Sequence, residues 1–131
     1  MRRIALAVAL ALLSLAFAPA PLPRPQRGSE PVRVEGEWKS TRTKNLMRIK
    51  GTRLSFLNGG RCEFELILDP SARPPAYRLR GLGGAQGRDY EGIYRLEGDV
   101  LTMHDNPAER GRPLSFEDPA TEVEVYRRTG R

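Results

Sequence analysis

The chain has very little of three residue types that carry chemistry or cross-links. Its 131 residues include one cysteine, Cys62, one histidine, His104, and one tryptophan, Trp38. A single cysteine has no partner within the chain, so a disulfide-stapled fold is excluded. Structural zinc sites take four cysteine or histidine ligands, and this chain does not have them. We therefore expect neither a metal nor a cofactor.

The excess of positive charge is concentrated near the beginning of the chain. The formal net charge is +6, but residues 1–30 contain four arginines and one glutamate, so residues 31–131 carry only +3. Nucleic-acid-binding domains present a strongly basic surface. The charge distribution therefore argues against a nucleic-acid partner.

Residues 1–18 are typical of a secretory signal peptide. Arg2 and Arg3 are followed by residues 4–18, which are apolar except for one serine. A basic start followed by a short apolar run is the export pattern, and the run is shorter than the ~20 residues that span a membrane. We predict export to the periplasm or the extracellular space, with cleavage near residues 16–20. The alternative is an uncleaved leader that tethers the chain to the membrane.

Residues 19–31 are predicted to be a linker. They contain five of the eleven prolines, namely Pro19, Pro21, Pro23, Pro25 and Pro31. Proline-rich segments are extended and semi-rigid. The folded domain is therefore predicted over residues 32–131.

Alternation of apolar and polar residues predicts an all-β domain. Beyond residue 30 no window sustains the 3.6-residue spacing of a helix, whereas an alternation with period two recurs. Strands are predicted at residues 37–43, 54–56, 62–68, 77–80, 90–97, 101–103, 114–116 and 123–126. Residues 43–50 fit either a helical turn or a strand.

Short turn sequences separate the predicted strands. Residues 58–60 (Asn-Gly-Gly) and 98–99 (Gly-Asp) are hairpin sequences, because Asn and Gly tolerate positive φ, and residues 81–87 form a glycine-rich loop. About eight short strands, most with one apolar and one charged face, form a sandwich or close into a barrel, and closure removes exposed edges. We predict a small antiparallel up-and-down barrel.

A short motif links the two ends of the domain. Gly36 and Trp38 form a G-x-W motif at the start of the first predicted strand, and Arg127 lies at the end of the last. This arrangement resembles the signature of lipocalin-like barrels, in which an arginine of the final strand covers the tryptophan. Arg127 shares the parity of Val123 and Val125, so we predict that it points inward over the indole. Such a contact contributes about 0.5–2 kcal/mol.

Four longer motifs follow one another along the domain. They are residues 35–38 (EGEW), 68–70 (LDP), 92–99 (GIYRLEGD) with Leu101, and 112–113 (RP) with Phe116. In this order they resemble a small lipocalin-like domain of unknown function that is abundant in planctomycete bacteria. The resemblance implies a lipocalin-like barrel and export, but no established activity. Its structural signature comprises Gly36, Trp38, Gly92, Tyr94, Gly98, Asp99 and Arg127.

The sequence shows no catalytic constellation. Cys62 alternates in phase with Phe64, which predicts an inert core cysteine. Domains of the planctomycete family that this chain resembles often carry a cysteine where this chain has Met103 and His104. Met103 is predicted to point inward, so His104 is predicted to lie on the surface, where one histidine beside Asp105 falls short of a metal site.

The acidic pairs are predicted to lie on the outside of the sheet. Glu63 and Glu65, like Glu122 and Glu124, are spaced by two residues, which places each pair on the outward face of a strand. Cross-strand ion pairs with Arg53, Arg78 or Arg80 are expected. The chain is therefore predicted not to be an enzyme.

Large side chains on the inward face suggest either a filled core or a ligand pocket. The candidates are Trp38, Phe56, Phe64, Tyr77, Tyr94 and Met103. An eight-stranded barrel is just wide enough for side chains or one small ligand, and the short strands favour a filled core.

The sequence therefore predicts a monomeric exported module that is structural or binds a small apolar ligand or a protein partner. The alternative is a protease inhibitor that inserts its proline-rich N-terminal segment into a protease. Small exported barrels with a G-x-W start are similar to bacterial metalloprotease inhibitors, although those generally carry a disulfide.

Overall fold

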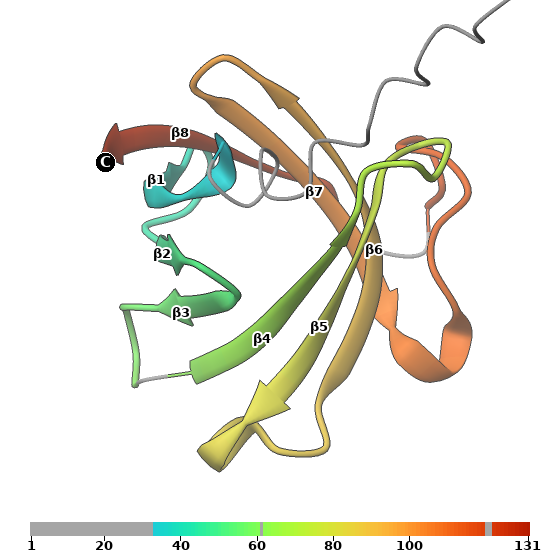
Figure 1. Cartoon of the computed structure of the whole chain (residues 1–131), viewed down its shortest axis with the longest axis horizontal. Coiled ribbons are helices and arrows are strands. Elements are labelled where there is room, and N and C mark those ends of the chain that lie inside the picture. Colours follow the sequence, from blue (N-terminus) through green and yellow to red (C-terminus); the bar gives the residue numbers. More distant parts are fainter. Residues whose placement is uncertain (1–32, 61, 120–121) are drawn as a thin grey trace, which may run out of the picture.

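The computed structural model describes residues 33–60, 62–119 and 122–131, and these ranges form a closed antiparallel barrel of eight strands (Figure 1). The predicted all-β barrel is thus confirmed. The predicted signal peptide and the predicted proline-rich linker lie outside the described residues. Within the described ranges, no helix has the length and apolar character needed to cross a membrane.

The strands follow one another around the barrel in chain order. They are β1 (Gly36–Ser40), β2 (Leu46–Lys50), β3 (Arg53–Phe56), β4 (Cys62–Asp69), β5 (Ala76–Leu82), β6 (Asp89–Glu97), β7 (Val100–Pro107) and β8 (Glu124–Gly130). Two short 3-10 turns, η1 (Gly83–Ala85) and η2 (Ala108–Arg110), follow β5 and β7. Each strand pairs with the next and β8 pairs with β1, so the backbone groups of these strands find partners on both sides.

The observed strands differ from the predicted ones in two segments. Residues 46–50, which fitted either a helical turn or a strand, form β2 and pair with both β1 and β3. Residues 114–116, predicted as a strand, lie in a loop instead. That prediction was wrong because this loop crosses the outside of the barrel rather than joining the sheet (Figure 1).

The predicted hairpin turns are present. Gly98 takes a φ of +58° in the two-residue turn between β6 and β7, and Gly59 and Gly60 take φ values of +76° and +105° between β3 and β4. These left-handed conformations favour glycine. Gly81, predicted in the glycine-rich loop, belongs to β5 instead, and a Cβ there would lie 1.8 Å from the carbonyl oxygen of Ala85.

Apolar side chains fill the interior of the barrel. The buried cluster comprises Val34, Trp38, Met47, Ile49, Leu54, Phe64, Leu66, Tyr77, Leu79, Ala85, Tyr94, Leu101, Met103 and Tyr126. Phe56 and Cys62 pack against it and are partly buried, so Cys62 lies at the edge of the core rather than within it. The interior cavity between Val34, Leu66 and Met103 measures about 10 Å³. This is no more than one water molecule needs, so the interior is a core and not a pocket.

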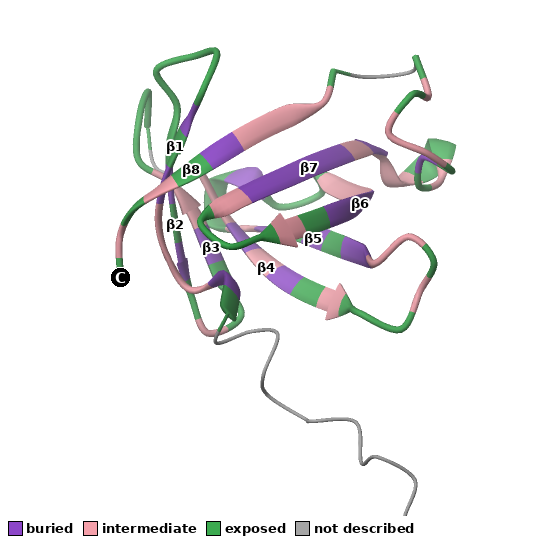
Figure 2. Cartoon of the chain, turned by 90° about the horizontal axis from the view of Figure 1, so that it is seen from above, coloured by how far each residue is buried: buried purple, intermediate pink, exposed green. Residues whose placement is uncertain are grey.

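A second buried layer lies outside the barrel, beneath residues 108–119, which we call the strap. Ile93 of β6 and His104 of β7 face each other across the two strands and are both fully buried, although Ile93 does not belong to the interior cluster. In the strap, Pro113 is also fully buried. Figure 2 shows that β7 is buried along most of its length, as expected for a strand covered on both faces.

Two contacts hold the strap against the sheet. The Asn106 side chain donates a hydrogen bond from Nδ2 to the carbonyl oxygen of Gly111 at 3.1 Å. The Arg95 guanidinium lies 4.7 Å from the centre of the Phe116 ring. The strap explains why the predicted surface position of His104 was wrong: its face of β7 points away from the interior, but the strap covers it.

Arg127 was predicted to lie over the indole of Trp38, but that prediction was wrong: the contact comes from Arg128. The Arg128 guanidinium carbon lies 4.3 Å from the centre of the indole ring, whereas Arg127 is exposed. The inward residues of β8 include Tyr126, which is buried, so parity with Val125 gave the wrong face. The apolar Val125 is half-buried on the outer face, opposite the buried Thr102.

Arg128 also ties the beginning of the domain to its end. It donates hydrogen bonds to the carbonyl oxygens of Arg33 and Glu35, the former at 2.6 Å, and its Nε lies 2.9 Å from Asp99 Oδ1. Gly36 allows this approach, because a Cβ there would lie 2.9 Å from the guanidinium and 2.6 Å from a backbone oxygen. The signature positions Gly36 and Asp99 are therefore parts of one closing contact.

Candidate functional site

Polar groups inside the barrel gather around Asp105. Tyr77 donates a hydrogen bond from its hydroxyl to Asp105 Oδ2 at 2.5 Å. Its ring passes over Gly92, where a Cβ would lie 2.5 Å from the ring, which explains glycine at that signature position. Across the barrel seam, Ser40 donates a hydrogen bond to Glu124 at 3.2 Å.

Burial controls the protonation of these groups. Burial raises the pKa of the Asp105 carboxyl, although the Tyr77 hydrogen bond opposes the shift by favouring the ionised form. Burial likewise raises the pKa of the Tyr77 and Tyr126 hydroxyls. The two phenols therefore remain protonated, and Tyr77 donates its proton to the hydrogen bond with Asp105. Since the cavity beside them admits no substrate, we interpret this cluster as structural.

The predicted acidic pairs are not brought together into a site. Glu63 and Glu65 lie on the outer face of β4 and form ion pairs with Arg53 and Arg80, which confirms the expected cross-strand pairing. Glu124 is the exception, because it points inward with Tyr126 and is half-buried.

Neither His104 nor the acidic residues form a metal centre. Neither ring nitrogen of His104 has a hydrogen-bond partner. Across the ranges the structure describes, no group of three or more His, Cys, Asp or Glu side chains converges on a common point.

The predicted interior candidates are found together in the core. Trp38, Phe64, Tyr77, Tyr94 and Met103 belong to the buried cluster, and Phe56 packs against it. Within the described residues they pack between the strands, and the interior pocket beside Tyr77, Tyr94 and Met103 is only about 10 Å³, far below the volume of an ordinary ligand site.

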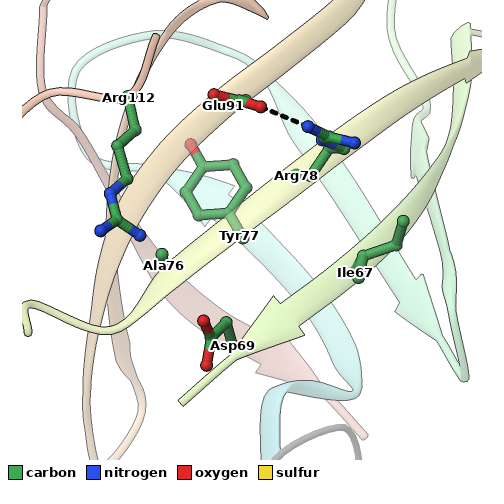
Figure 3. A pocket seen from close by; sticks show the side chains of 7 residues that line it. All are labelled: Ile67, Asp69, Ala76, Tyr77, Arg78, Glu91 and Arg112. Atoms are coloured by element: carbon green, nitrogen blue, oxygen red, sulfur yellow. Dashed lines mark hydrogen bonds and ion pairs between the residues drawn. The ribbon is translucent and has the colours of Figure 1, made fainter. Parts of the chain in front are cut away.

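A groove on the outer face of the barrel is the better candidate for binding. It crosses β4, β5 and β6, is closed on one side by the strap and has a volume of about 360 Å³ (Figure 3). We call it the β4–β6 groove, and its lining residues are Ile67, Asp69, Ala76, Tyr77, Arg78, Glu91 and Arg112. Three of these residues, Ile67, Ala76 and Tyr77, are apolar or aromatic, and the other four are charged. Binding sites commonly combine apolar surface with polar groups that fix the orientation of the ligand.

The charged side chains of the groove differ in how they are engaged. Arg78 and Glu91, cross-strand neighbours on β5 and β6, form an ion pair at 2.5 Å (Figure 3). Asp69 accepts hydrogen bonds from the Ser71 hydroxyl at 2.7 Å and the Ser71 backbone, and these lower the pKa of its carboxyl. Arg112 makes no hydrogen bond or ion pair within the described ranges, but its positive charge contributes to the lowered pKa of the Asp69 carboxyl.

Two larger surface hollows are less suited to a ligand. The hollow of about 570 Å³ beside Arg128 and Asp99 is built around an arginine that already holds three partners. The hollow of about 560 Å³ beside η1 is lined mainly by glycines and charged residues, so it offers little apolar surface.

The alternation of residues did not reveal this groove. Its floor residue Ile67 shares the outward parity of Glu63 and Glu65 on β4, and no pattern in the sequence links it to Arg112. One signal was present in the sequence: Asp69 and Arg112 both belong to the motifs that carry the family resemblance. The structure places these two motifs on the same groove.

The chain matches no protein-family model, no curated protein and no solved structure.

Proposed function

We propose that this chain is an exported, non-enzymatic binding module whose barrel interior is purely structural and whose partner binds on the outer surface at the β4–β6 groove. One observation carries the choice of surface: the interior cavity is about 10 Å³, whereas the groove is about 360 Å³. A ligand carrier needs an interior volume of roughly 300 Å³ or more. The small apolar ligand considered from the sequence is therefore the less favoured partner, and a protein partner the more favoured one.

Export and the lipocalin-like relationship are further parts of this proposal. Residues 1–18 support export through their basic start and apolar run. The G-x-W motif, together with an arginine of the last strand over Trp38, supports a lipocalin-like barrel. The inhibitor alternative depends on residues 19–31, which lie outside the described residues.

The proposal is tested by mapping where small probes bind. The ¹⁵N-labelled chain is titrated with a library of short peptides and small fragments, and amide chemical shifts are followed. We expect the shifts to cluster at Ile67, Arg78 and Glu91 and at the strap. Shifts confined to interior residues such as Leu66 and Met103 would contradict the proposal, because they would indicate a ligand inside the barrel.

A further inference from the structure

The floor of the β4–β6 groove is apolar but short. Ile67 is 45% exposed, which is unusual for an isoleucine on a strand, and Ala76 is almost fully buried beside it. These two side chains can cover one small or medium apolar group. They cannot cover a long acyl chain, which would extend over the charged Asp69 and Glu91.

Among the described residues, Arg112 is the charged group of the groove that makes no hydrogen bond or ion pair, although its charge also helps to lower the pKa of the Asp69 carboxyl. Glu91 is neutralised by Arg78, and Asp69 is engaged by Ser71. Figure 3 shows the Arg112 side chain hanging from the strap toward Ala76, at the end of the groove opposite the Arg78–Glu91 pair. A guanidinium has a planar fork of donors that fits a carboxylate in bidentate fashion. The groove therefore favours an anionic group placed next to a small apolar one.

The surrounding groups favour a peptide as the source of that carboxylate. The Arg78–Glu91 pair offers donors and acceptors at the far end of the groove, where the amide groups of an extended peptide would lie. The sheet is closed, so a peptide cannot add to it as an extra strand and must be recognised through side chains.

We propose that the β4–β6 groove binds the C-terminal carboxylate of a partner polypeptide that ends in a small or medium apolar residue. Arg112 holds the carboxylate, and Ile67 and Ala76 contact the terminal side chain. This assignment rests on the proposed function and specifies the chemistry of its partner. The strap contributes to specificity because it carries Arg112 to the groove. The next residue of the strap, Pro113, is fully buried and so fixes the position of this segment.

The test compares three probes on the full chain by amide chemical shifts. The probes are acetyl-Ala-Val with a free carboxylate, the same peptide as a C-terminal amide, and hexanoate. We expect the free acid to bind about tenfold or more tightly than the amide, because the amide cannot form the charge-assisted hydrogen bonds that a carboxylate accepts from a guanidinium. Hexanoate should bind weakly because most of its chain finds no apolar surface.

Three variants separate the carboxylate from the groove. Arg112→Gln should make the acid and the amide bind equally, whereas Arg110→Gln, on the same strap but outside the groove, should leave the tenfold difference intact. Ile67→Glu should abolish binding of both peptides. Because the Ile67 side chain is exposed, this substitution should leave the barrel folded.

Each contrary result has its own meaning. Equal binding of acid and amide that is lost in Ile67→Glu would overturn the carboxylate assignment and leave the groove as the binding surface. Tighter binding of hexanoate than of the peptide would overturn the peptide as source. Peptide binding unaffected by both Ile67→Glu and Arg112→Gln would overturn the groove, and with it the proposed function. Absence of binding by all three probes at about 10 mM would overturn the carboxylate assignment alone.

Discussion

Asp105 is a carboxylate that the fold places inside the barrel, and burial raises its pKa above the ordinary value of 3.8. Such a group contributes stability that is fully present below its ordinary pKa and is lost as the pH rises through the higher folded value. Asp105→Asn should therefore raise the melting temperature at pH 7 by a few degrees and leave it unchanged near pH 3. The amide oxygen can still accept the Tyr77 hydrogen bond. Thermal unfolding across this pH range measures the effect.

Asp69 provides a control of opposite sign. Hydrogen bonds from Ser71 lower the pKa of its carboxyl, so its contribution is present above the ordinary pKa and is lost as the pH falls through the lower folded value. Asp69→Asn should thus lower the melting temperature at pH 7 but not at strongly acidic pH. If both variants shifted in the same direction at pH 7, burial of Asp105 would not be what sets its protonation.

His104 is a buried imidazole with two unsatisfied ring nitrogens. A buried polar group without a partner costs about 1–3 kcal/mol, so His104→Leu should leave the free energy of unfolding unchanged or raise it by about 1 kcal/mol. The control is Ile93→Ala, directly opposite on β6, which should cost about 2–5 kcal/mol. Urea unfolding measures both. A loss in His104→Leu as large as that in Ile93→Ala would mean that the imidazole finds a hydrogen-bond partner in solution.

At the scale of elements, alternation located most strands but gave the wrong face where the strap intervenes. In β4, Phe64 points inward and Glu63 and Glu65 point outward as predicted, because that strand has one wet face. In β7 and β8 residues of the outer face are also buried or half-buried, as His104 and Val125 are. The apolar or polar character of such a residue therefore does not tell which face of the strand points inward. The strap itself was predicted to contain a strand, and its covering role depends on tertiary contacts that period two cannot encode.

The strap lies in a loop outside the sheet, and the Arg95–Phe116 contact is one of those that hold it, so we expect it to open without unfolding the barrel. Phe116→Ala removes the ring over which Arg95 lies, so the strap should detach more often. Trypsin should then cleave the exposed Arg110–Gly111 bond several-fold faster, while the melting temperature falls by less than about 4 °C.

Leu114→Ala is the matched control for the strap. Leu114 lies two residues away in the same segment but is 81% exposed, so it should change neither the cleavage rate nor the stability. An equal acceleration by both variants would show that the strap is accessible to trypsin regardless of the Phe116 contact.

At the scale of the whole molecule, the closed barrel depends on the seam between β1 and β8. The register along this seam shifts between Glu37 and Trp38, and next to the shift Arg128 reaches across to the carbonyl oxygens of Arg33 and Glu35. The interior pocket measures about 10 Å³, which agrees with the proposal that a partner binds on the outer face.

The seam leads to a prediction that distinguishes two adjacent arginines. Arg128→Met removes the charge above Trp38, the hydrogen bonds to two carbonyl oxygens and the ion pair with Asp99, and its side chain is only 10% exposed. We expect a loss of about 2–4 kcal/mol in the free energy of unfolding. Arg127→Met, on an exposed side chain, should change it by less than about 0.5 kcal/mol. Urea unfolding followed by the fluorescence of Trp38, the chain's single tryptophan, reports on the seam directly. A larger loss in Arg127→Met than in Arg128→Met would contradict the pairing of Trp38 with Arg128. It would mean that β8 is shifted by one residue along β1 and that Arg127 lies over the indole.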